Sequence, residues 1–257
     1  MSPRLSIVVP ARNEEHRLGR MLDSYLPYFT EKYGDQIEFI VVVNGSTDRT
    51  AEVARAYAER WPGLKVLEDP NPIGKGGAVK KGFEAAQGEW IGFVDADGAT
   101  PPEAFEDLVR HLNGHGAIIA NRWHPESVVT PRQPWSRRVA SRLFNLLVRL
   151  LFRIPIRDTQ CGAKVLTRRA MKDILPHLGI TQWAFDVDLL FQLRRHGYSI
   201  AERPTVWHDI PGSHIRIGRS SLEMFVAIVR LRLIYSPFRW IVWLYDHTLG
   251  RVIHHRV

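Results

Sequence analysis

The chain has 257 residues, 45% hydrophobic and 24% charged, which suits one sizeable buried core and excludes global disorder. A single cysteine, Cys161, excludes an intramolecular disulfide framework and a cysteine-rich zinc site. The net charge of +8 is uneven, with −5 on residues 1–121 and +13 on residues 122–257. The basic second half indicates an anionic partner: nucleic acid, a phosphorylated substrate or an anionic membrane.

Short apolar strands alternate with amphipathic helices in the first half. Strands are predicted at 5–10, 37–43, 64–68, 90–94 and 117–121. Helices are predicted at about 15–26, from 46 or 47 to 60, from the loop 71–77 to about 86, and from 101 onward. This order predicts an α/β fold with a parallel, doubly wound sheet. Ligands bind such sheets at the carboxyl ends of the strands, where polar residues recur: 12–14, 44–46, 69–71 and 95–97.

Two motifs at these strand ends could carry chemistry. Asp95 and Asp97 lie two residues apart and could both approach one hard divalent cation, although D-x-D is also common in turns and helix caps. Such a cation would stabilise a leaving nucleoside diphosphate. The loop Gly74–Gly77, which contains Lys75, is either an ordinary turn or a phosphate-binding helix start. It is not a Walker A loop.

Seven segments, in this order and spacing, resemble the GT-A domain of family 2 glycosyltransferases. Four are VVPARNEE (8–15), VVNGSTDRT (42–50), NPIGKGGAVKKG (71–82) and FVDADGATPP (93–102). Three later ones are similar to the dolichyl-phosphate β-glucosyltransferases, and more distantly to the corresponding mannosyltransferases: IRDTQCGAKVLTR (156–168), QWAFDVDLL (182–190) and WHDIPGSHIR (207–216). The resemblance covers about residues 4–235 and implies a mostly parallel sheet flanked by helices.

The resemblance implies an inverting, metal-dependent transfer of a hexose to a polyprenyl or dolichyl phosphate. The favoured donor is UDP-glucose, and the alternative is a GDP-mannose-dependent mannosyltransferase. Mg²⁺ or Mn²⁺ is expected on Asp95 and Asp97. Asn44 stands where the family usually has an Asp, and Ala99 stands where related enzymes have a polar residue that can join the metal. The expected donor-binding residues are Pro10, Ala11, Asn13, Glu14, Asn44, Lys75, Gly76, Asp95 and Ala96.

Three carboxylates are expected to be catalytic: Asp97, Asp186 and Asp158. Asp186 and Asp188 would lie about 200° apart on a helix, so only one of them can face the site. Asp186 stands at the helix start as a functional carboxylate; the alternative is that it caps the helix and Asp188 is solvated. A phosphate acceptor needs little deprotonation, so Asp186 is expected to position the acceptor rather than to act as a general base. Cys161 is interpreted as a packed side chain. The acceptor phosphate is expected to meet Arg122, Arg138, Arg142, His214 and Arg216.

An amphipathic helix is predicted at 135–152, with apolar side chains on one face and arginines beside them: Val139, Leu143, Leu146, Leu147 and Leu150; Arg138, Arg142, Arg149 and Arg153. It is either a packed surface helix or a helix lying in a membrane interface. A second amphipathic region, 224–234 with 238–244, is too interrupted by charges to span a membrane. The predicted division is a GT-A domain at 1–217 and membrane-interface or dimerisation helices at 218–257.

The expected location is the cytoplasmic face of a membrane, with peripheral attachment, no signal peptide and no transmembrane span. The expected partners are the nucleotide sugar, the polyprenyl phosphate, an anionic membrane surface and a second copy in a homodimer. A nucleic-acid-binding module is a different interpretation of the basic half, but no RNA- or DNA-binding motif is recognisable, and no nucleic-acid partner is expected. A third interpretation is a non-catalytic glycosyltransferase-like scaffold, which the intact Asp95 and Asp97 pair disfavours.

Overall fold

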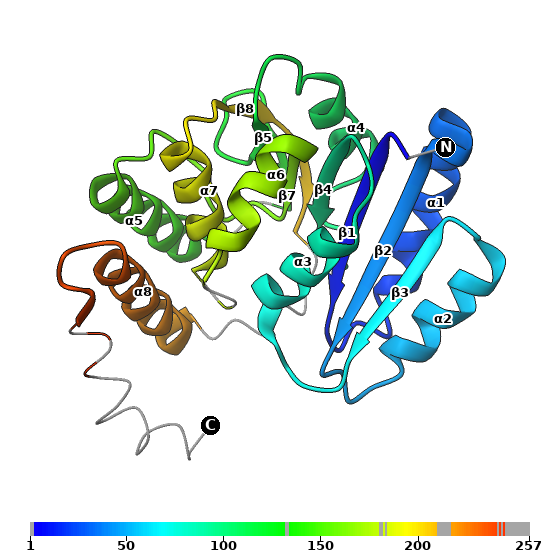
Figure 1. Ribbon diagram of the computed structural model, residues 1–257, viewed down its shortest axis with the longest axis horizontal. Helices are drawn as coiled ribbons and strands as arrows, with labels where there is room; N and C mark the ends of the chain where they lie inside the picture. Colours follow the sequence, from blue (N-terminus) through cyan, green and yellow to red (C-terminus); the bar gives the residue numbers. More distant parts are fainter. Residues whose placement is uncertain are drawn as a thin grey trace.

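The computed structural model describes residues 3–131, 134–179, 182, 184–209, 217–240, 242 and 244. A seven-stranded sheet in the order β3-β2-β1-β4-β7-β5-β8 forms the centre, with helices on both faces (Figure 1). All five strands predicted from the sequence are present. The strands are β1 (Leu5–Ala11), β2 (Ile37–Asn44), β3 (Leu64–Asp69), β4 (Trp90–Val94), β5 (Ala117–Asn121), β7 (Ala163–Thr167) and β8 (Ile200–Pro204).

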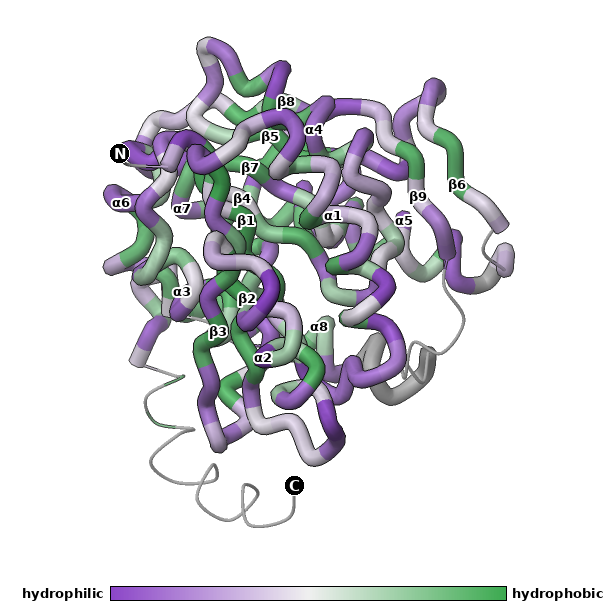
Figure 2. Tube along the Cα trace, turned by 90° about the vertical axis from the view of Figure 1, so that its right-hand side faces the viewer, coloured by the Kyte–Doolittle hydropathy of each residue, from purple (hydrophilic) through white to green (hydrophobic). Residues whose placement is uncertain are grey.

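Two layers of helices enclose two apolar cores, one on each face of the sheet. One layer contains α1 (Leu18–Tyr33), α2 (Thr50–Arg60) and α4 (Pro102–Arg110). The other contains α3 (Gly74–Ala85), α5 (Trp135–Phe152), α6 (Arg168–Ile174), α7 (Phe185–Arg195) and α8 (Ile217–Ile234). Short 3₁₀ turns lie at η1 (Gly34–Gln36) and η2 (Leu175–His177). Figure 2 shows hydrophobic residues concentrated along the central strands.

Helix α1 is longer than the sequence pattern indicates, because it passes through Pro27 and ends at Tyr33. The proline removes a backbone donor from the helix interior. The residues after it bury aromatic surface that favours continuation of the helix. Phe29 is fully buried and packs edge-on against Phe39 and Phe105.

Strand β7 is antiparallel, whereas the other pairings in the main sheet are parallel. It lies between β4 and β5, and its Lys164 stands opposite Phe93 on one side and Ile119 on the other. The sequence pattern did not identify this strand. Its position brings the loop that precedes it, residues 158–162, beside the end of β4.

A second, two-stranded sheet pairs β6 (Val128–Thr130) with β9 (Val206–His208) in parallel. Figure 2 shows this pair at the right, apart from the main sheet. It joins the segment that follows β5 to the segment that follows β8. Arg122, on the first segment, is therefore brought beside Trp207, on the second.

Helix α5 has the predicted bounds, and its predicted apolar face is exposed. Val139, Leu143, Leu146 and Leu150 are 46%, 62%, 48% and 69% exposed. The opposite side of α5 is buried, and α8 lies beside the helix with Ile228 and Leu231 in the same core. No helix in the described part of the chain is long and apolar enough to cross a membrane. The predicted division at residue 217 coincides with the start of α8 and stays a prediction.

Candidate functional site

The residues expected to bind the donor gather where β1, β2 and β4 end, at the lower edge of the sheet in Figure 1. Ala11 and Asn44 are the last residues of β1 and β2, and Asp95 directly follows β4. Pro10 is half-buried in β1, and Ala96 is buried after β4. The parallel strands therefore place side chains from distant parts of the chain along one edge, as the sequence predicts.

The loops after β1 and β2 are tied together by hydrogen bonds. Asn13 has a φ of 56°, in the left-handed region, and its Oδ1 accepts a hydrogen bond from the Thr47 N–H at 2.9 Å. Its own N–H donates to Ser46 Oγ at 3.2 Å. The Glu14 N–H donates to Thr50 Oγ1 at 2.8 Å. This side of the site is held by backbone contacts, independently of any ligand.

Glu14 is paired within its own loop. Its carboxylate accepts hydrogen bonds from Arg17 Nε and Nη2 at 2.6 and 2.8 Å. Burial raises the pKa of Glu14; Arg17 lowers it, and the nearby Asp97 and Asp95 add to the rise. Glu14 therefore lies near the carboxylates of Asp95 and Asp97. A nucleotide-sugar donor that contacted Glu14 would share the Glu14 carboxylate oxygens with Arg17.

Asn44 is buried and retains an acceptor without a partner. Its Nδ2 donates to the Ala11 carbonyl at 3.4 Å, while its Oδ1 has no hydrogen-bond partner within the described structure. The next residue, Gly45, has a φ of 57°, and a Cβ there would lie 2.5 Å from the Pro72 nitrogen. The turn thus requires glycine and fixes Asn44 at the strand end, with one oxygen available to a hydrogen-bond donor.

Asp95 and Asp97 form a partly buried acidic pair beside Lys75. Lys75 Nζ lies 2.6 Å from Asp95 Oδ1, and Asp97 Oδ1 accepts from the Ala99 N–H at 2.9 Å. Burial and then the charge of Asp95 raise the pKa of Asp97. Burial alone would lower the pKa of Lys75, but Asp95 and Asp186 outweigh it and hold that pKa above its usual range.

This pair suits a hard divalent cation, because two mutually repelling carboxylates are the oxygen ligands that Mg²⁺ and Mn²⁺ accept. Among the described residues no group of three or more His, Cys, Asp or Glu side chains could hold a metal. Asp95 and Asp97 would therefore supply two ligands, and phosphate oxygens or water the others. Ala99, a buried alanine, offers no third side-chain ligand.

Two glycines allow close approach around the pair. A Cβ at Gly162 would lie 1.9 Å from Asp95 Oδ2, so a larger residue there would force the Asp95 carboxylate to move. A Cβ at Gly76 would lie 2.5 Å from the Phe185 side chain, so Gly76 sets the contact between α3 and α7. The structure thus gives Gly76 a packing role, and its predicted contact with the donor stays a prediction.

Asp186 and Asp188 lie in the first turn of α7 and have different partners. Asp186 Oδ1 lies 2.5 Å from Lys164 Nζ, and its Oδ2 lies 4.0 Å from Lys75 Nζ. Burial acts to raise the pKa of Asp186, but Lys164 and Lys75 outweigh it and lower that pKa. A chain of alternating charge thus runs from Asp95 through Lys75 and Asp186 to Lys164.

The alternative in which Asp188 is solvated is wrong, because its side chain is fully buried. Its Oδ1 accepts a hydrogen bond from the Tyr235 hydroxyl at 2.7 Å, and its Oδ2 accepts from the Gly179 N–H at 3.0 Å. Tyr235 follows α8 directly. Asp188 therefore fastens α8 to α7, whereas Asp186 faces the lysines.

Asp158 is the counterion of Arg122. The Arg122 backbone N–H, Nε and Nη2 donate to its carboxylate at 2.9, 2.8 and 2.9 Å, and Asp158 is fully buried. The Arg122 guanidinium lies 4.8 Å from the centre of the Trp207 ring, which belongs to β9. Asp158 is thus placed to hold Arg122, and its expected service with Asp186 stays a prediction.

The other predicted phosphate-binding residues divide into two groups. Arg138 is half-buried on α5, and the exposed Arg142 lies 5.3 Å from the ring centre of Trp123, the neighbour of Arg122 in sequence. His214 and Arg216 lie outside the described residues. Arg122 and Arg142 thus each lie over an aromatic ring; Arg122 is half-buried and Arg142 is exposed.

Lys164 is the site residue that sequence reasoning missed. It is a lysine in a short apolar segment, AKVLT, and its side chain is only 1% exposed. A lysine among buried hydrophobic residues needs a counterion, which is the signal that could have identified it. Cys161 is buried as expected, and burial together with Asp158 raises the pKa of its thiol to about 12.

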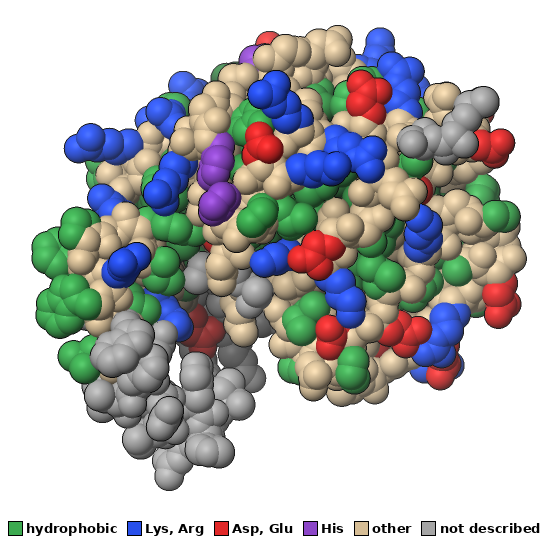
Figure 3. All heavy atoms as spheres, in the orientation of Figure 1, with side chains coloured by type: hydrophobic (Ala, Val, Ile, Leu, Met, Phe, Trp, Pro, Cys, Tyr) green, Lys and Arg blue, Asp and Glu red, His purple; other side chains and the backbone are tan. Residues whose placement is uncertain are grey.

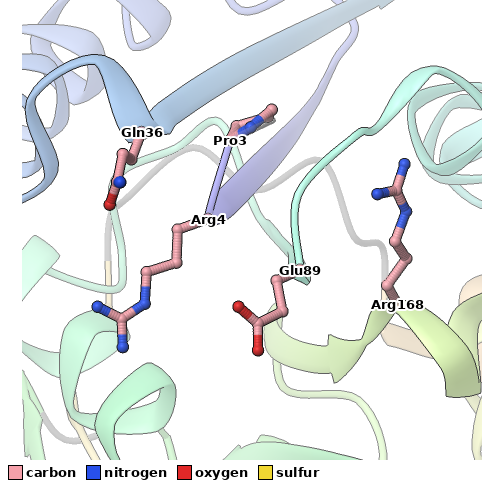
Figure 4. A pocket seen from close by; sticks show the side chains of 5 residues that line it. All are labelled: Pro3, Arg4, Gln36, Glu89 and Arg168. Carbon is pink, nitrogen blue, oxygen red and sulfur yellow. The ribbon is translucent and has the colours of Figure 1, made fainter. Parts of the chain in front are cut away.

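A pocket of about 350 Å³ lies at the other end of the sheet (Figure 4). Arg4 precedes β1, Gln36 precedes β2 and Glu89 precedes β4. These are the amino ends of the parallel strands, opposite the edge that carries the acidic pair. The pocket is therefore separate from the candidate site.

The chain is similar to known proteins over most of its length. The model of the family described as "Glycosyl transferase family 2" matches residues 6–175. Dolichyl-phosphate beta-glucosyltransferase of Dictyostelium discoideum is 36% identical over 92% of this chain and 76% of that protein. The human protein of the same name is 34% identical over 92% and 77%.

A solved structure shares the fold. Glucosyl-3-phosphoglycerate synthase from Mycobacterium tuberculosis, in complex with Mn²⁺ and UDP-glucose, superposes with a TM-score of 0.64 at 18% identity, over 90% of this chain and 79% of that one. The architecture is the GT-A fold. On the family match and the two relatives, the chain belongs to glycosyl transferase family 2.

Proposed function

We propose that this protein transfers glucose from UDP-glucose to a dolichyl or other polyprenyl phosphate at a membrane surface. The observation that carries the proposal is the line of charges Asp95, Lys75, Asp186 and Lys164, which joins the acidic pair after β4 to a buried carboxylate on α7. It provides a place for a metal-bound diphosphate next to a charged group on the acceptor side. The names of the two relatives support both the sugar and the acceptor.

The donor side is assigned to the loops at the ends of β1, β2 and β4. When bound, Mg²⁺ or Mn²⁺ on Asp95 and Asp97 would neutralise the diphosphate of the departing UDP. Lys75 is the nearest cation that could also contact a phosphate oxygen. The unpaired Asn44 Oδ1 could accept a hydrogen bond from the base or the ribose. A structural neighbour crystallised with Mn²⁺ and UDP-glucose supports this assignment.

The acceptor phosphate is assigned to the arginines around α5. In the reaction, a phosphate oxygen forms a bond to the anomeric carbon as the bond from that carbon to the UDP oxygen breaks, with inversion. The acceptor is already an anion, so no side chain must remove a proton. Arg122, with Arg138, Arg142, His214 and Arg216, would hold the phosphate. Asp186 would orient it rather than deprotonate it.

A membrane surface would supply such an acceptor, and the exposed face of α5 fits one. Trp135 is 77% exposed and Leu150 is 69% exposed, at opposite ends of α5, and the exposed Arg149 and Arg153 lie at the same end as Leu150. In Figure 3 hydrophobic and cationic side chains gather together at the left edge, over α5 and α8. Apolar side chains flanked by arginine are the pattern of helices that lie in a lipid interface.

The test is transfer by the purified protein with Mn²⁺ and a short polyprenyl phosphate. UDP-glucose and GDP-mannose are offered separately, and the lipid product is identified by mass spectrometry. We expect a hexosyl phosphate lipid with UDP-glucose and none after chelation by EDTA. A product with GDP-mannose alone would identify a mannosyltransferase. No product with any nucleotide sugar would exclude the proposed reaction.

A further inference from the structure

Lys164 is a fully enclosed cation at the centre of the molecule. Its Nζ donates to Asp186 Oδ1 at 2.5 Å and to the Cys161 carbonyl at 2.6 Å, and its side chain is 1% exposed. The ammonium also lies 5.2 Å from the centre of the Phe93 ring. Strand β7 carries Lys164 opposite Phe93, so the sheet itself fixes where this charge stands.

Burial of the Lys164 charge is unfavourable for the free energy of folding, so its ion pair with Asp186 is weak evidence of a stabilising role. The free energy needed to remove an ammonium and a carboxylate from water can exceed the free energy gained from their attraction. Well-packed apolar residues often replace buried ion pairs without loss of stability. The pair nevertheless occupies the middle of an apolar core that includes Phe93 and Phe185. A requirement of the site explains its presence better than stability does.

Lys75 and Lys164 each pair with a different carboxylate. Lys75 lies 2.6 Å from Asp95 and 4.0 Å from Asp186, whereas Lys164 lies 2.5 Å from Asp186. Lys75 is 36% exposed and can turn toward a ligand, but Lys164 is enclosed and cannot. Asp186 therefore has a permanent counterion of its own, and Lys75 remains available to Asp95 and to the donor.

We propose that Lys164 is a positioning residue that holds the Asp186 carboxylate in one orientation toward the acceptor while leaving Lys75 free for the donor side. This inference rests on the proposed function, because Asp186 is assigned there to orient the acceptor phosphate. Without Lys164, Asp186 would lose its nearest hydrogen-bond donor and would compete with Asp95 for Lys75. The acceptor would then be oriented less well, although Asp95, Asp97 and the loops after β1 and β2 would remain intact.

The experiment compares Lys164→Met, Asp186→Asn and the double variant with the wild type in the transfer assay. We expect Lys164→Met to lower kcat about 100-fold, the scale of a small misplacement in an active site, with the KM for UDP-glucose nearly unchanged. The double variant should be no slower than Asp186→Asn alone, because one residue acts through the other. Lys164→Gln serves as a second variant if the methionine protein does not fold.

Lys65→Met is the matched control. Lys65 Nζ lies 3.0 Å from the buried carboxylate of Glu38, at the amino end of β2 and away from the site. This change also removes the lysine partner of a buried carboxylate, and we expect wild-type kcat. A Lys164 variant with wild-type kcat, a loss confined to KM, or losses that multiply in the double variant would overturn the inference.

Thermal unfolding of the same four proteins separates this inference from the proposed function. Asp186→Asn should lower the Tm of the wild type, because it leaves Lys164 buried and unpaired. It should lower the Tm less, or raise it, in the Lys164→Met background. A wild-type protein that transfers no sugar would overturn the proposed function alone. Equal Tm shifts in the two backgrounds would overturn the inference.

Discussion

The two sides of the candidate site hold their charged groups by different means. On the donor side, loops after β1, β2 and β4 are fixed through hydrogen bonds from backbone N–H groups, and Asp95, Asp97 and Lys75 remain half-buried. On the acceptor side, Arg122 and Asp186 are each clamped by a buried partner, Asp158 and Lys164. In the proposed reaction, the side that exchanges a metal and a diphosphate would need movable charges, whereas the side that orients one phosphate would benefit from fixed ones.

The largest expected effect tests the donor side. Asp97→Asn keeps the acceptor for the Ala99 N–H but removes one charge from the pair. We expect the transfer rate to fall about 1,000-fold, the upper range for removal of one electrostatic contributor, with loss of Mn²⁺-dependent thermal stabilisation. Asp107→Asn, an exposed carboxylate paired with Arg203, is the control. Retained metal stabilisation in Asp97→Asn would place the metal elsewhere.

The next effect tests whether the acceptor side is clamped. Asp158→Asn leaves the Arg122 guanidinium buried without its counterion, which costs about 3 kcal/mol or more in comparable buried pairs. We expect a clear loss of unfolding free energy in urea, beyond the loss for Asp107→Asn. If Asp158 instead served the chemistry alone, the variant would be inactive and as stable as the wild type.

A third prediction concerns the exposed face of α5. Leu143→Glu with Leu150→Glu places charge on two side chains that are 62% and 69% exposed. Binding to anionic liposomes should weaken more than tenfold, because a leucine buried in lipid contributes about 1.5–3 kcal/mol. Val128→Glu on β6, a residue 55% exposed, is the matched control.

Two other outcomes would change the interpretation of α5. A change from dimer to monomer without an effect on liposome binding would identify the face as a subunit contact. Salt-dependent retention on DNA, with no binding to liposomes in the wild type, would favour a nucleic-acid-binding surface instead.

A smaller effect is expected at the end of β2. Asn44→Ala removes the one buried oxygen there that has no partner in the described structure. We expect about tenfold weaker binding of UDP, the scale of a single hydrogen bond, measured by titration calorimetry with Mn²⁺. The exposed Asn113→Ala is the control. Unchanged affinity would remove Asn44 from the donor site.

The smallest effect concerns Cys161, whose buried thiol has a pKa of about 12, against an ordinary value of 9.0. Because the unfolded chain loses this proton more readily, the stability of the wild type relative to Cys161→Ala should fall as pH rises from about 9 toward 12. The native thiol should also resist alkylation near pH 8. Rapid alkylation of the folded protein would contradict its burial.

Local patterns predicted the strand ends that carry Asn44 and Asp95, but not the surroundings of Asp186. The strands before Asn44 and Asp95 are apolar runs, and the polar residues after them meet because parallel strands share an edge. Strand β7 was not predicted, because the sequence pattern treats Lys164 as an exposed residue. Its burial depends on Asp186, which is distant in sequence and pairs with it only in the folded chain. The alternative of a solvated Asp188 fails for the same reason, since Tyr235, which donates a hydrogen bond to it, lies 47 residues away.

Helix α5 shows another limit of sequence patterns. Periodicity identified an apolar face with arginines beside it, but did not decide whether that face is buried or exposed. The structure turns Asn145 and Val148 inward and leaves Leu143 and Leu150 exposed. Asn145 Oδ1 accepts hydrogen bonds from the Thr159 N–H and Oγ1 at 2.9 and 2.8 Å, which fixes the rotation of the helix.

The insertion of β7 between β4 and β5 also bears on how the chain folds as it is synthesised. Strands β3, β2, β1 and β4 are complete at residue 94, and they pair among themselves. The strand pairings of β5 are with β7 and β8, so about 40 residues must follow it before it can join the sheet. We therefore expect the donor half to fold first on the ribosome, with the acceptor half added to an already formed template.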